Sequence, residues 1–424
     1  MRRVWDVVTS YSLLMIGGAL LALLWANLDP GSYHALVDWT ILERSPVGYP
    51  TYAEDGTVAS RTLTLHYLVN DVLMALFFAI AAKEVWEAVA LRGGSLRGRR
   101  AFVPVLSALG GMAGPIAVYL ALAAVMGSET WDALAHGWAV PTATDIAFSF
   151  LVARIVFGAG HPAVRFLLML AIVDDALGLL IIAVFYPKGA VAPEWLLLSL
   201  AAALAVFLRF NQLPRALDAR RGTRDASAWA RGLSFWPYLV AGELSWYGFQ
   251  QAGLHPALGL LPIVPAIPHA DLDFGLYAEA GGRGDLLNRI EHALKAPVEV
   301  ILFLFGLLNA GVELTSAGAA TWLVLAGLLI GKPVGILALG WVGARAMRLG
   351  LPQGMTLGDV LVVGFIAAIG FTVALFVAGV AFAPEATLAG VPVQEAAKLG
   401  ALLSVLAAPV AILAGRALGV RRVP

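Results

Sequence analysis

The sequence predicts an all-α protein that crosses a membrane many times, and three observations support this fold class. Of its 424 residues, 60% are hydrophobic and only 13% are charged, whereas an ordinary soluble domain is about 25% charged. The mean hydropathy is +0.83. The apolar residues are gathered into segments of about 20, the length that an α-helix needs to cross the hydrocarbon core of a bilayer. We therefore expect a single membrane transport domain over residues 1–424.

We expect about twelve spans, each of about 20 mainly apolar residues. Helices are expected because an open sheet cannot satisfy its backbone hydrogen bonds in lipid, and the segments lack the alternation of outer-membrane strands. The segments lie near residues 10–28, 64–88, 101–125, 138–156, 163–186, 195–211, 230–250, 254–269, 294–313, 320–346, 358–382 and 396–418. The chain then divides into a first span (1–28), an exported loop (29–63), spans 2 to 8 (64–269), a cytoplasmic loop (270–293) and spans 9 to 12 (294–424).

The distribution of charge predicts an even number of spans with both termini in the cytoplasm. Cytoplasmic loops collect Lys and Arg. Alternate loops are rich in arginine, as at 92–100 and 209–231, whereas the loops between them are mainly acidic, as at 29–55. The start of the chain, Met1 to Asp6, is too short and polar for a cleaved signal peptide, so we expect the first apolar segment to be retained.

Composition also excludes several classes of function. Lys+Arg and Asp+Glu both number 28, so the net charge of +0 provides no basic surface for nucleic acid. The absence of cysteine excludes disulfides, thiol chemistry and metal sites built on cysteine.

The first long loop contains a candidate β-hairpin. In TYAEDGTVAS, residues 51–60, residues that favour strands flank Asp55-Gly56, a dipeptide suited to a tight hairpin turn. An exported hairpin and a plain solvated loop both remain open on this pattern.

Four ionisable residues stand out inside predicted spans, where each costs about 2.5 to 3.5 kcal/mol at a helix centre. They are Asp145, Asp174, Asp175 and Lys332. Asp174 lies about 18 Å along a helix that starts near Pro162 and rises about 1.5 Å per residue, which is close to the midplane of a core about 30 Å thick. Lys332 lies at a similar depth in its own span, so a cation and carboxylates are expected to meet there.

Adjacent residues of a helix point about 100° apart, so Asp174 and Asp175 cannot both face one partner. A purely structural pair of Asp174 with Lys332 would neutralise charge but would leave Asp175 unexplained. Ionisable residues within a membrane are by default functional, and we therefore expect one aspartate to meet the lysine while the other faces a cavity.

Two spans contain signals for a broken helix. AVPTATDIAF, residues 139–148, places Pro141, Thr142, Thr144 and Asp145 in span 4, and FIAAIGFTVALF, residues 365–376, is interrupted by Gly370 in span 11. Proline removes a backbone donor, and threonine hydroxyls can bond nearby backbone groups. Discontinuous helices of this kind bind ions in transporters, and the pair suggests an inverted repeat.

Four motifs, occurring in order, resemble the NhaA-type sodium/proton antiporters. They are VPTATDIAF, AIVDDALGLLIIAVFY, IGKPVGI and VGFIAAIGFTVALF, and the similarity extends from VNDVLMALFF near Asn70 to AKLGALLSVLAA near Lys398. The resemblance implies inverted repeats with crossing broken helices in spans 4 and 11. It also implies a secondary antiporter that exchanges cytoplasmic Na+ or Li+ for external H+, electrogenic and regulated by pH, and not an enzyme.

The resemblance further implies the setting of the protein. No cofactor is expected, and the partners are Na+ or Li+, protons, membrane lipid and a second copy of the chain, paired through the exported hairpin. The family is usually found in the bacterial cytoplasmic membrane.

The resemblance also assigns roles to single residues. Asp175 would be the principal ligand for sodium and protons, with Asp174 beside it and Lys332 as its ion-pair partner. Thr144 and Asp145 would lie at the crossing of the broken helices, where Asp145 offsets the positive helix ends. The residues matched to the pH response or to the funnels are Asp71, Glu84, Glu291 and His292.

The chain departs from the family pattern in places. After Glu84 the usual basic cluster is replaced by Val85-Trp86-Glu87, while Lys83 is new and Lys295 stands where histidine is frequent. Glu243 and Glu299 are further acids in apolar spans, for which we expect a structural or partly solvated role.

Other classes fit less well. An intramembrane aspartyl protease needs two aspartates that face each other from separate helices, and a prenyltransferase needs spaced aspartates for magnesium. A channel would be expected to show rings of carbonyls or acids from several subunits. The main alternative is a proton- or sodium-coupled symporter that uses the same aspartates.

Overall fold

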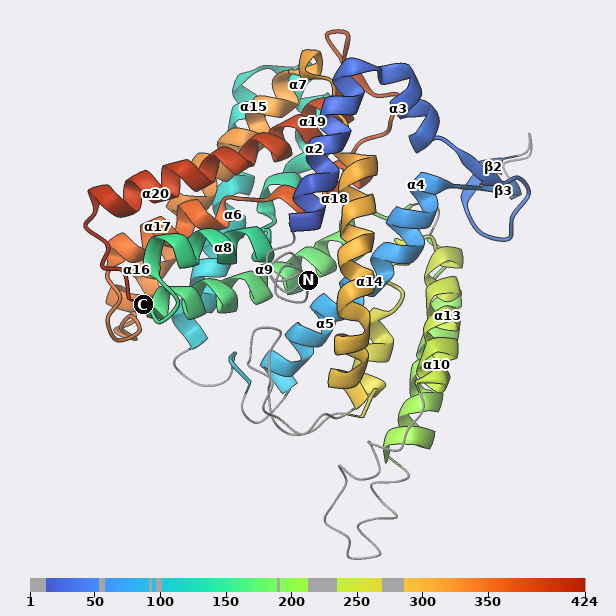
Figure 1. The fold of residues 1–424 in the computed structure, drawn as a ribbon, viewed down its shortest axis with the longest axis horizontal. Coiled ribbons are helices and arrows are strands. Elements are labelled where there is room, and N and C mark those ends of the chain that lie inside the picture. The colour runs from blue at the N-terminus through green and yellow to red at the C-terminus, as the bar shows by residue number, and fades with distance from the viewer. Residues whose placement is uncertain are drawn as a thin grey trace, which may run out of the picture. The chain divides into compact units, whose positions relative to one another are not determined.

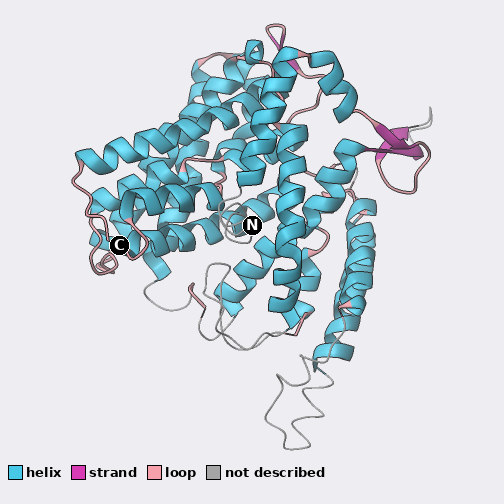
Figure 2. Ribbon diagram, in the orientation of Figure 1, coloured by secondary structure: helices cyan, strands magenta, loops and turns pink. Residues whose placement is uncertain are grey.

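The computed structural model describes residues 13–52, 58–90, 94–96, 101–188, 191–212, 235–268 and 286–423. These residues are mainly helical, with a small three-stranded sheet (Figures 1 and 2). Their contacts divide the chain into two compact units. Unit 1 contains Met1–Tyr33, Ser95–Ile181 and Gly306–Pro424, and unit 2 contains His34–Gly94 and Ile182–Phe305.

Unit 1 contains the segments that carry the aspartates and the lysine of the predicted ion site. Its elements are α2 (Leu13–Leu28), α6 (Phe102–Val125), α7 (Ser128–Leu134), η3 (Ala135–Thr142), α8 (Ile146–Phe157), most of α9 (Pro162–Phe185), η8 (Leu314–Ser316), α15 (Ala319–Ala326), η9 (Gly327–Gly331), α16 (Lys332–Trp341), η10 (Val342–Ala346), α17 (Leu357–Ala367), α18 (Phe371–Ala381), β4 (Thr387–Leu388), β5 (Val391–Pro392), α19 (Val393–Leu403), η11 (Ser404–Leu406) and α20 (Ala407–Ala417). The short helix α3 (Pro30–Val37) begins in this unit.

Unit 2 combines the sheet with helices around an apolar core. Its elements are β1 (Thr40–Leu42), β2 (Tyr49–Tyr52), β3 (Val58–Thr64), α4 (Leu65–Tyr67), η1 (Leu68–Leu73), α5 (Met74–Ala90), η4 (Pro193–Trp195), α10 (Leu196–Val206), η5 (Phe207–Gln212), α13 (Trp236–Gln251), η6 (Pro256–Leu258), η7 (Leu261–Ala266) and most of α14 (Leu286–Asn309). Its core includes Ala202, Val206, Tyr238, Ile263 and Leu287.

The predicted hairpin is confirmed as an antiparallel pair of β2 and β3. Tyr49 lies opposite Thr62, and Thr51 lies opposite Ser60. β1 pairs with the other edge of β3, so the sheet order is β1-β3-β2. The predicted turn at Asp55-Gly56 lies outside the described residues, and the exported location of the hairpin stays a prediction.

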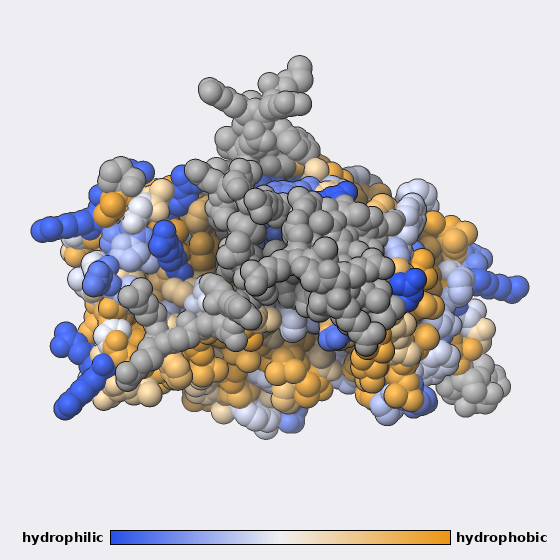
Figure 3. Space-filling model, turned by 90° about the horizontal axis from the view of Figure 1, so that it is seen from below, coloured by the Kyte–Doolittle hydropathy of each residue, from blue (hydrophilic) through white to orange (hydrophobic). Residues whose placement is uncertain are grey.

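Six described helices are long and apolar enough to cross a membrane, or eight if each of two bent helix pairs counts as one span. They support a multi-pass membrane protein, while the expected number of about twelve spans stays a prediction. Leu197, Leu200 and Leu204 on α10 are 66%, 53% and 46% exposed, which suits a helix side that faces lipid rather than water. Apolar residues cover much of the surface seen in Figure 3, and hydrophilic side chains project at its edges.

Two boundary predictions are corrected by the structure. The window at 254–269 is not one spanning helix, because it forms the short 3-10 helices η6 and η7 with prolines at 256, 262 and 265. Proline removes the amide donor that a continuous α-helix needs. The predicted loop 270–293 is also too long, since α14 already begins at Leu286. The part of that loop at 270–285 lies outside the described residues.

Facing glycines place α16 close against α6. A Cβ added at Gly335 would overlap the carbonyl oxygen of Gly110, and one added at Gly114 would overlap that of Gly331. Gly110 and Gly114 of α6, and Gly331 at the end of η9 with Gly335 of α16, thus form two small-xxx-small pairs, which let membrane helices approach at the level of their backbones. This packing holds the first turn of α16, and with it Lys332, in a fixed position.

Candidate functional site

Span 4 is broken as predicted. The 3-10 helix η3 ends at Thr142, residues 143–145 are extended, and α8 starts at Ile146. The helices on either side of this break are bent by 55°. Pro141 lies inside η3, where its missing amide is consistent with the failure of an α-helix to continue.

Span 11 is broken in the same manner, and the two breaks contact each other. α17 and α18 are bent by 51° around residues 368–370. Ile369 O accepts a hydrogen bond of 2.7 Å from the backbone N of Asp145. Ala367 O accepts one of 3.1 Å from Thr144 Oγ1, and Ile366 O accepts one of 3.0 Å from Ser149 Oγ. Carbonyls of the interrupted helix therefore bond to the other break.

Asp145 caps two helices. Its Oδ1 accepts a hydrogen bond of 3.0 Å from the backbone N of Phe148 in the first turn of α8. Its Oδ2 accepts hydrogen bonds from the hydroxyl and the backbone N of Thr372 in the first turn of α18. A carboxylate at a helix N-terminus satisfies free amides and opposes the positive end of the dipole, so Asp145 stabilises both helix starts.

Asp174 contacts both Lys332 and Thr144 in unit 1. Its Oδ2 is 3.1 Å from Lys332 Nζ, and both side chains are fully buried. The same oxygen accepts a hydrogen bond of 2.7 Å from Thr144 Oγ1. Lys332 Nζ also donates to Thr142 O at 2.5 Å, which ties the lysine to the break in span 4. A buried ion pair is maintained only when such further hydrogen bonds compensate the loss of solvation.

The other carboxylate oxygen has a different environment. Asp174 Oδ1 is buried and has no hydrogen-bond partner among the described residues. The neighbouring Asp175 is partly exposed rather than buried. Within the described part of the chain, no three His, Cys, Asp or Glu side chains gather closely enough to hold a metal ion. The Thr144 hydroxyl is the further side-chain oxygen that contacts Asp174.

Unit 2 gathers a second set of ionisable residues around Lys83. Its Nζ is 2.9 Å from Glu87 Oε2, forms an ion pair with Glu291 and donates to Asn288 Oδ1 at 3.1 Å. Glu291 is thus buried in an ion pair, whereas His292 is exposed and Glu84 is partly buried.

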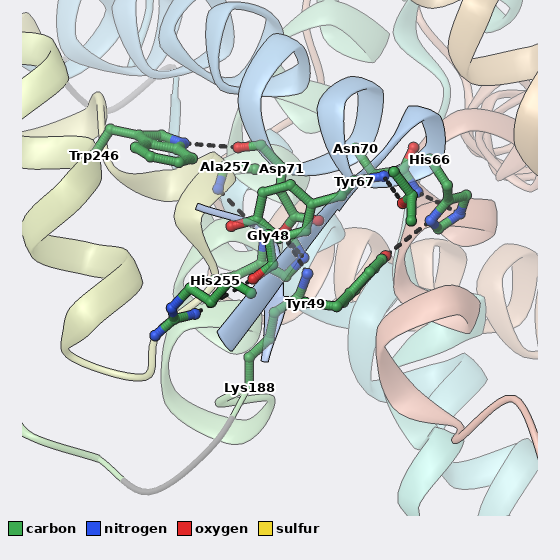
Figure 4. Close-up of polar contacts among 12 residues, drawn as sticks. Gly48, Tyr49, His66, Tyr67, Asn70, Asp71, Lys188, Trp246, His255 and Ala257 are labelled. Atoms are coloured by element: carbon green, nitrogen blue, oxygen red, sulfur yellow. Dashed lines mark hydrogen bonds and ion pairs between the residues drawn. The ribbon is translucent and has the colours of Figure 1, made fainter. Parts of the chain in front are cut away.

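Asp71, the remaining pH-response candidate, has its own cluster in unit 2 (Figure 4). It forms an ion pair with Lys188, and His255 Nε2 lies 3.7 Å from its Oδ1. Of the two unexplained acids in spans, Glu299 is 7% exposed, in accordance with a structural role, and Glu243 is exposed.

Sequence reasoning missed several partners that the structure provides. The sequence marks Lys83 and Glu87 only as departures from a family pattern, and it does not predict that Lys83 pairs with both Glu87 and Glu291. Lys188 lies in a connection between predicted spans, where charged residues are ordinary, and His255 lies at the start of the predicted span 254–269. Nothing in the sequence indicates that either meets Asp71. Thr372 carries a weak signal, since it follows the Gly370 break by two residues, where a helix start would be expected.

These observations define a class of protein: a multi-pass membrane protein with a buried lysine–aspartate pair at the contact of two broken helices. The fold resembles the solved structure of the sodium proton antiporter MjNhaP1 from Methanocaldococcus jannaschii, with a TM-score of 0.52 and 13% identity, over 96% of this chain and 91% of that one.

The sequence places the chain more closely. The family described as Na+/H+ antiporter 1 matches residues 2–415. The Na(+)/H(+) antiporter NhaA of Jannaschia sp. is 62% identical over 418 residues, which are 98% of each chain. That of Geobacter sulfurreducens is 45% identical over 429 residues and 100% of each chain. The chain belongs to the Na+/H+ antiporter 1 family, and the family identified from its motifs is confirmed.

Proposed function

We propose that this chain is a secondary antiporter that exchanges cytoplasmic Na+ or Li+ for external H+. Its family and the names of its relatives support sodium/proton exchange. The buried aspartates take part in binding and releasing ions, and no bond-making chemistry is assigned to them. The bacterial cytoplasmic membrane, with both termini inside, is the proposed location.

One observation carries the assignment of the site. Asp174 gives one oxygen to Lys332 and Thr144, while its other oxygen is buried without a partner among the described residues and Asp175 adjoins it in the chain. Asp174 can therefore bind either the ammonium group of Lys332 or an incoming cation, because one of its oxygens has no partner among the described residues. Hard oxygen donors are what sodium prefers.

The mechanism follows from competition for these oxygens. Protons and sodium compete for Asp175, and sodium also draws the Asp174 carboxylate away from Lys332. Without its counter-ion the buried lysine loses its proton, because burial penalises an unpaired charge. More than one proton then moves for each sodium, which makes the exchange electrogenic. Alternating access carries sodium out in one state and protons in through the other.

Thr144 and Asp145 support this cycle without carrying the exchanged proton. Thr144 joins Asp174 to span 11 through its hydroxyl, and Asp145 holds the starts of α8 and α18. Movement at the contact of the breaks therefore changes the surroundings of Asp174. Glu84, Glu291 and His292 contribute to the pH response, with Glu291 acting through Lys83. The protein acts as a homodimer whose hairpins pair, within membrane lipid.

The test is proton movement driven by sodium. In everted vesicles or proteoliposomes containing a pH-sensitive dye, addition of Na+ or Li+ releases protons through the wild-type protein, and K+ serves as the control cation. The substitution Asp175→Asn keeps the size of the side chain and removes its charge, and we expect it to abolish the response. Release that persists in this variant would place the ligand elsewhere. Co-movement of protons with sodium would favour the symporter instead.

A further inference from the structure

Asp71 is a second carboxylate that the proposed exchange does not use as its ion ligand, and its side chain is fully buried. It lies in η1, a π-helical turn before α5, and such turns are frequent at functional sites. Its Oδ1 pairs with Lys188, whereas its Oδ2 is buried and has no hydrogen-bond partner among the described residues. Only one of the two carboxylate oxygens is therefore used by Lys188, and the other can still accept a hydrogen bond from a cation.

Two aromatic rings complete a cage around the charge on Lys188. Its Nζ lies 5.7 Å from the centre of the Tyr49 ring and 5.8 Å from that of Tyr67. Figure 4 shows Tyr49, Tyr67 and Asp71 near Lys188. Rings within about 6 Å attract a cation through their negative faces, and aromatic cages are a common means of binding ammonium groups. A carboxylate with two rings is thus the recognition chemistry for an ammonium ion.

The walls of this cage are held by contacts of their own. Trp246 Nε1 donates to the backbone O of Asp71 at 2.8 Å. His255 Nδ1 accepts from the backbone N of Ala257 at 3.3 Å, so a neutral His255 carries its proton on Nε2, the nitrogen that faces Asp71. Trp246 thereby holds the backbone at Asp71, and His255 lies beside its carboxylate, without any contribution from Lys188.

Tyr49 is oriented in the same way by residues other than Lys188. Its hydroxyl lies 2.9 Å from His66 Nδ1, and His66 Nε2 lies 3.0 Å from Asn70 Nδ2. The ring position therefore depends on a polar chain that leads back to η1, one residue before Asp71.

Lys188, by contrast, enters the cage from a connection. α9 ends at Phe185, and Lys188 donates its backbone N–H to Gly253 O at 2.8 Å. Its side chain is 28% exposed, against 0% for Asp71. The ammonium group of Lys188 is therefore carried by a flexible, partly exposed side chain. The groups that surround it, Asp71 and the two tyrosine rings, lie in or beside helices and strands.

We infer that Asp71, Tyr49 and Tyr67 form a binding site for a small primary ammonium ion, which Lys188 fills as a tethered ligand. This site is separate from the sodium exchange proposed above. Removal of the tether empties it, and a free ammonium ion of matching size then binds in its place. n-Propylammonium is the matched probe, because Lys188→Ala removes three carbons and the ammonium group.

The experiment measures the melting temperature of the full-length protein in detergent. Lys188→Ala melts below the wild type, because the buried Asp71 carboxylate has lost its partner. Millimolar n-propylammonium raises that temperature in a saturable manner, whereas 1-propanol and K+ at equal concentration do not. Lys188→Met fills the same space without charge, so n-propylammonium leaves its melting temperature unchanged. In the double variant Lys188→Ala/Asp71→Asn the shift disappears.

Either of two results would overturn the inference: an equal shift with K+ or 1-propanol, or a shift that survives loss of the Asp71 charge. If Lys188→Ala does not fold, the melting temperatures of Lys188→Arg and Lys188→Met test the inference instead. Arginine keeps a cation that can stack on aromatic rings, whereas methionine has no charge. We then expect Lys188→Arg to melt close to the wild type and Lys188→Met well below it. Equal melting of these two variants would contradict a site that recognises charge. The melting temperature is measured without transport, so a negative result would contradict the ammonium site without contradicting the proposed sodium exchange.

Discussion

One carboxylate, that of Asp145, accepts hydrogen bonds at the start of both α8 and α18. The link to α18 depends on the Thr372 hydroxyl, which donates to the buried Oδ2. Loss of a donor to a buried acceptor is more costly than loss of an ordinary hydrogen bond, because the acceptor cannot regain water.

Thr372→Val should therefore destabilise the protein by about 1 to 3 kcal/mol, while Thr372→Ser, which retains the hydroxyl, should lie near the wild type. The measurement is thermal unfolding in detergent of the wild type and the two variants. A valine variant as stable as the serine variant would show that Asp145 does not depend on this donor.

A buried phenol makes a second prediction at the scale of single residues. Tyr33 is 2% exposed, donates its hydroxyl proton to Leu307 O at 2.9 Å and accepts from Gly311 N at 3.2 Å. A Cβ at Gly311 would overlap the Tyr33 ring, so glycine is required for this approach. Burial raises the pKa of the Tyr33 phenol above its usual value near 10.

The pKa of Tyr33 is higher in the folded chain than in the unfolded chain, so the unfolded chain releases the proton more readily as the pH rises. The contribution of Tyr33 to stability is therefore intact below about pH 10 and is lost above it. Tyr33→Phe has no proton to lose. We expect its free energy of unfolding to fall less steeply than that of the wild type above about pH 10, although the variant is less stable at pH 7. Parallel denaturation curves from neutral to alkaline pH check this, and equal slopes would refute it.

A residue of the candidate site could be predicted from the sequence when it was charged and lay in an apolar segment. Asp174, Asp175 and Lys332 interrupt apolar spans, so the cost of burying charge marked them. Lys188 is in a connection between helices and His255 is at the start of an apolar window, and only the fold brings them to Asp71. The same reasoning explains why Lys83 was noticed, while its bridge between Glu87 and Glu291 was not.

At the scale of elements, the contact of α6 with α16 determines where Lys332 lies. Gly335→Ala would place a Cβ against the Gly110 carbonyl oxygen, and overpacking of this kind typically costs about 1 to 3 kcal/mol. We expect lower stability and reduced sodium-driven proton release, because α16 must move away with Lys332 on its first turn.

Gly17→Ala in α2 is the matched control for that substitution. No atom lies within 4 Å of its added Cβ, and alanine favours a helix over glycine by about 1 kcal/mol. This variant should be at least as stable as the wild type and retain transport. Melting temperature and dye-based transport on both variants test the pair, and equal behaviour would argue against close packing of α6 and α16.

The contact between α5 and α14 depends on charge rather than on glycine. Lys83 is 3% exposed and lies between Glu87 and Glu291. Removing one partner of a buried ion pair costs about 3 to 5 kcal/mol, because the opposite charge stays buried. Lys83→Met should lose about that much, and addition of Glu291→Gln should restore part of it. Thermal unfolding of the single and double variants measures the coupling, and simple addition of two losses would contradict it.

Elements were predicted well where their signals were local and strong. The break in span 4 followed from Pro141 and its threonines, and that in span 11 from Gly370. Hydropathy averaged over a window does not detect the effect of proline on the backbone, so it predicts one continuous helix over 254–269, where the structure has the 3-10 helices η6 and η7. The start of α14 was missed because NRIEHALK is polar on average, although its charged side chains are tolerated on one side of a helix.

At the scale of the whole molecule, composition alone indicated a membrane protein. A chain with 60% hydrophobic and 13% charged residues cannot bury all of its apolar side chains in the core of a soluble domain. The number of spans is harder to predict. Broken helices and short helices such as α13, with 16 residues, do not match a fixed window length, and tertiary packing decides how they end.

The proposed exchange also predicts how the whole protein responds to its ions. A ligand that binds only the folded state stabilises it, by about 2.7 kcal/mol at 100 times the dissociation constant. Na+ should therefore raise the melting temperature of the wild type in detergent, and Li+ should do the same, whereas K+ at equal ionic strength should not. Since protons compete with sodium for Asp175, acidification should weaken the sodium effect. Asp175→Asn should remove it at every pH at which the variant stays folded. A sodium shift that is independent of pH and survives this substitution would separate cation binding from Asp175 and leave the proposed competition without support.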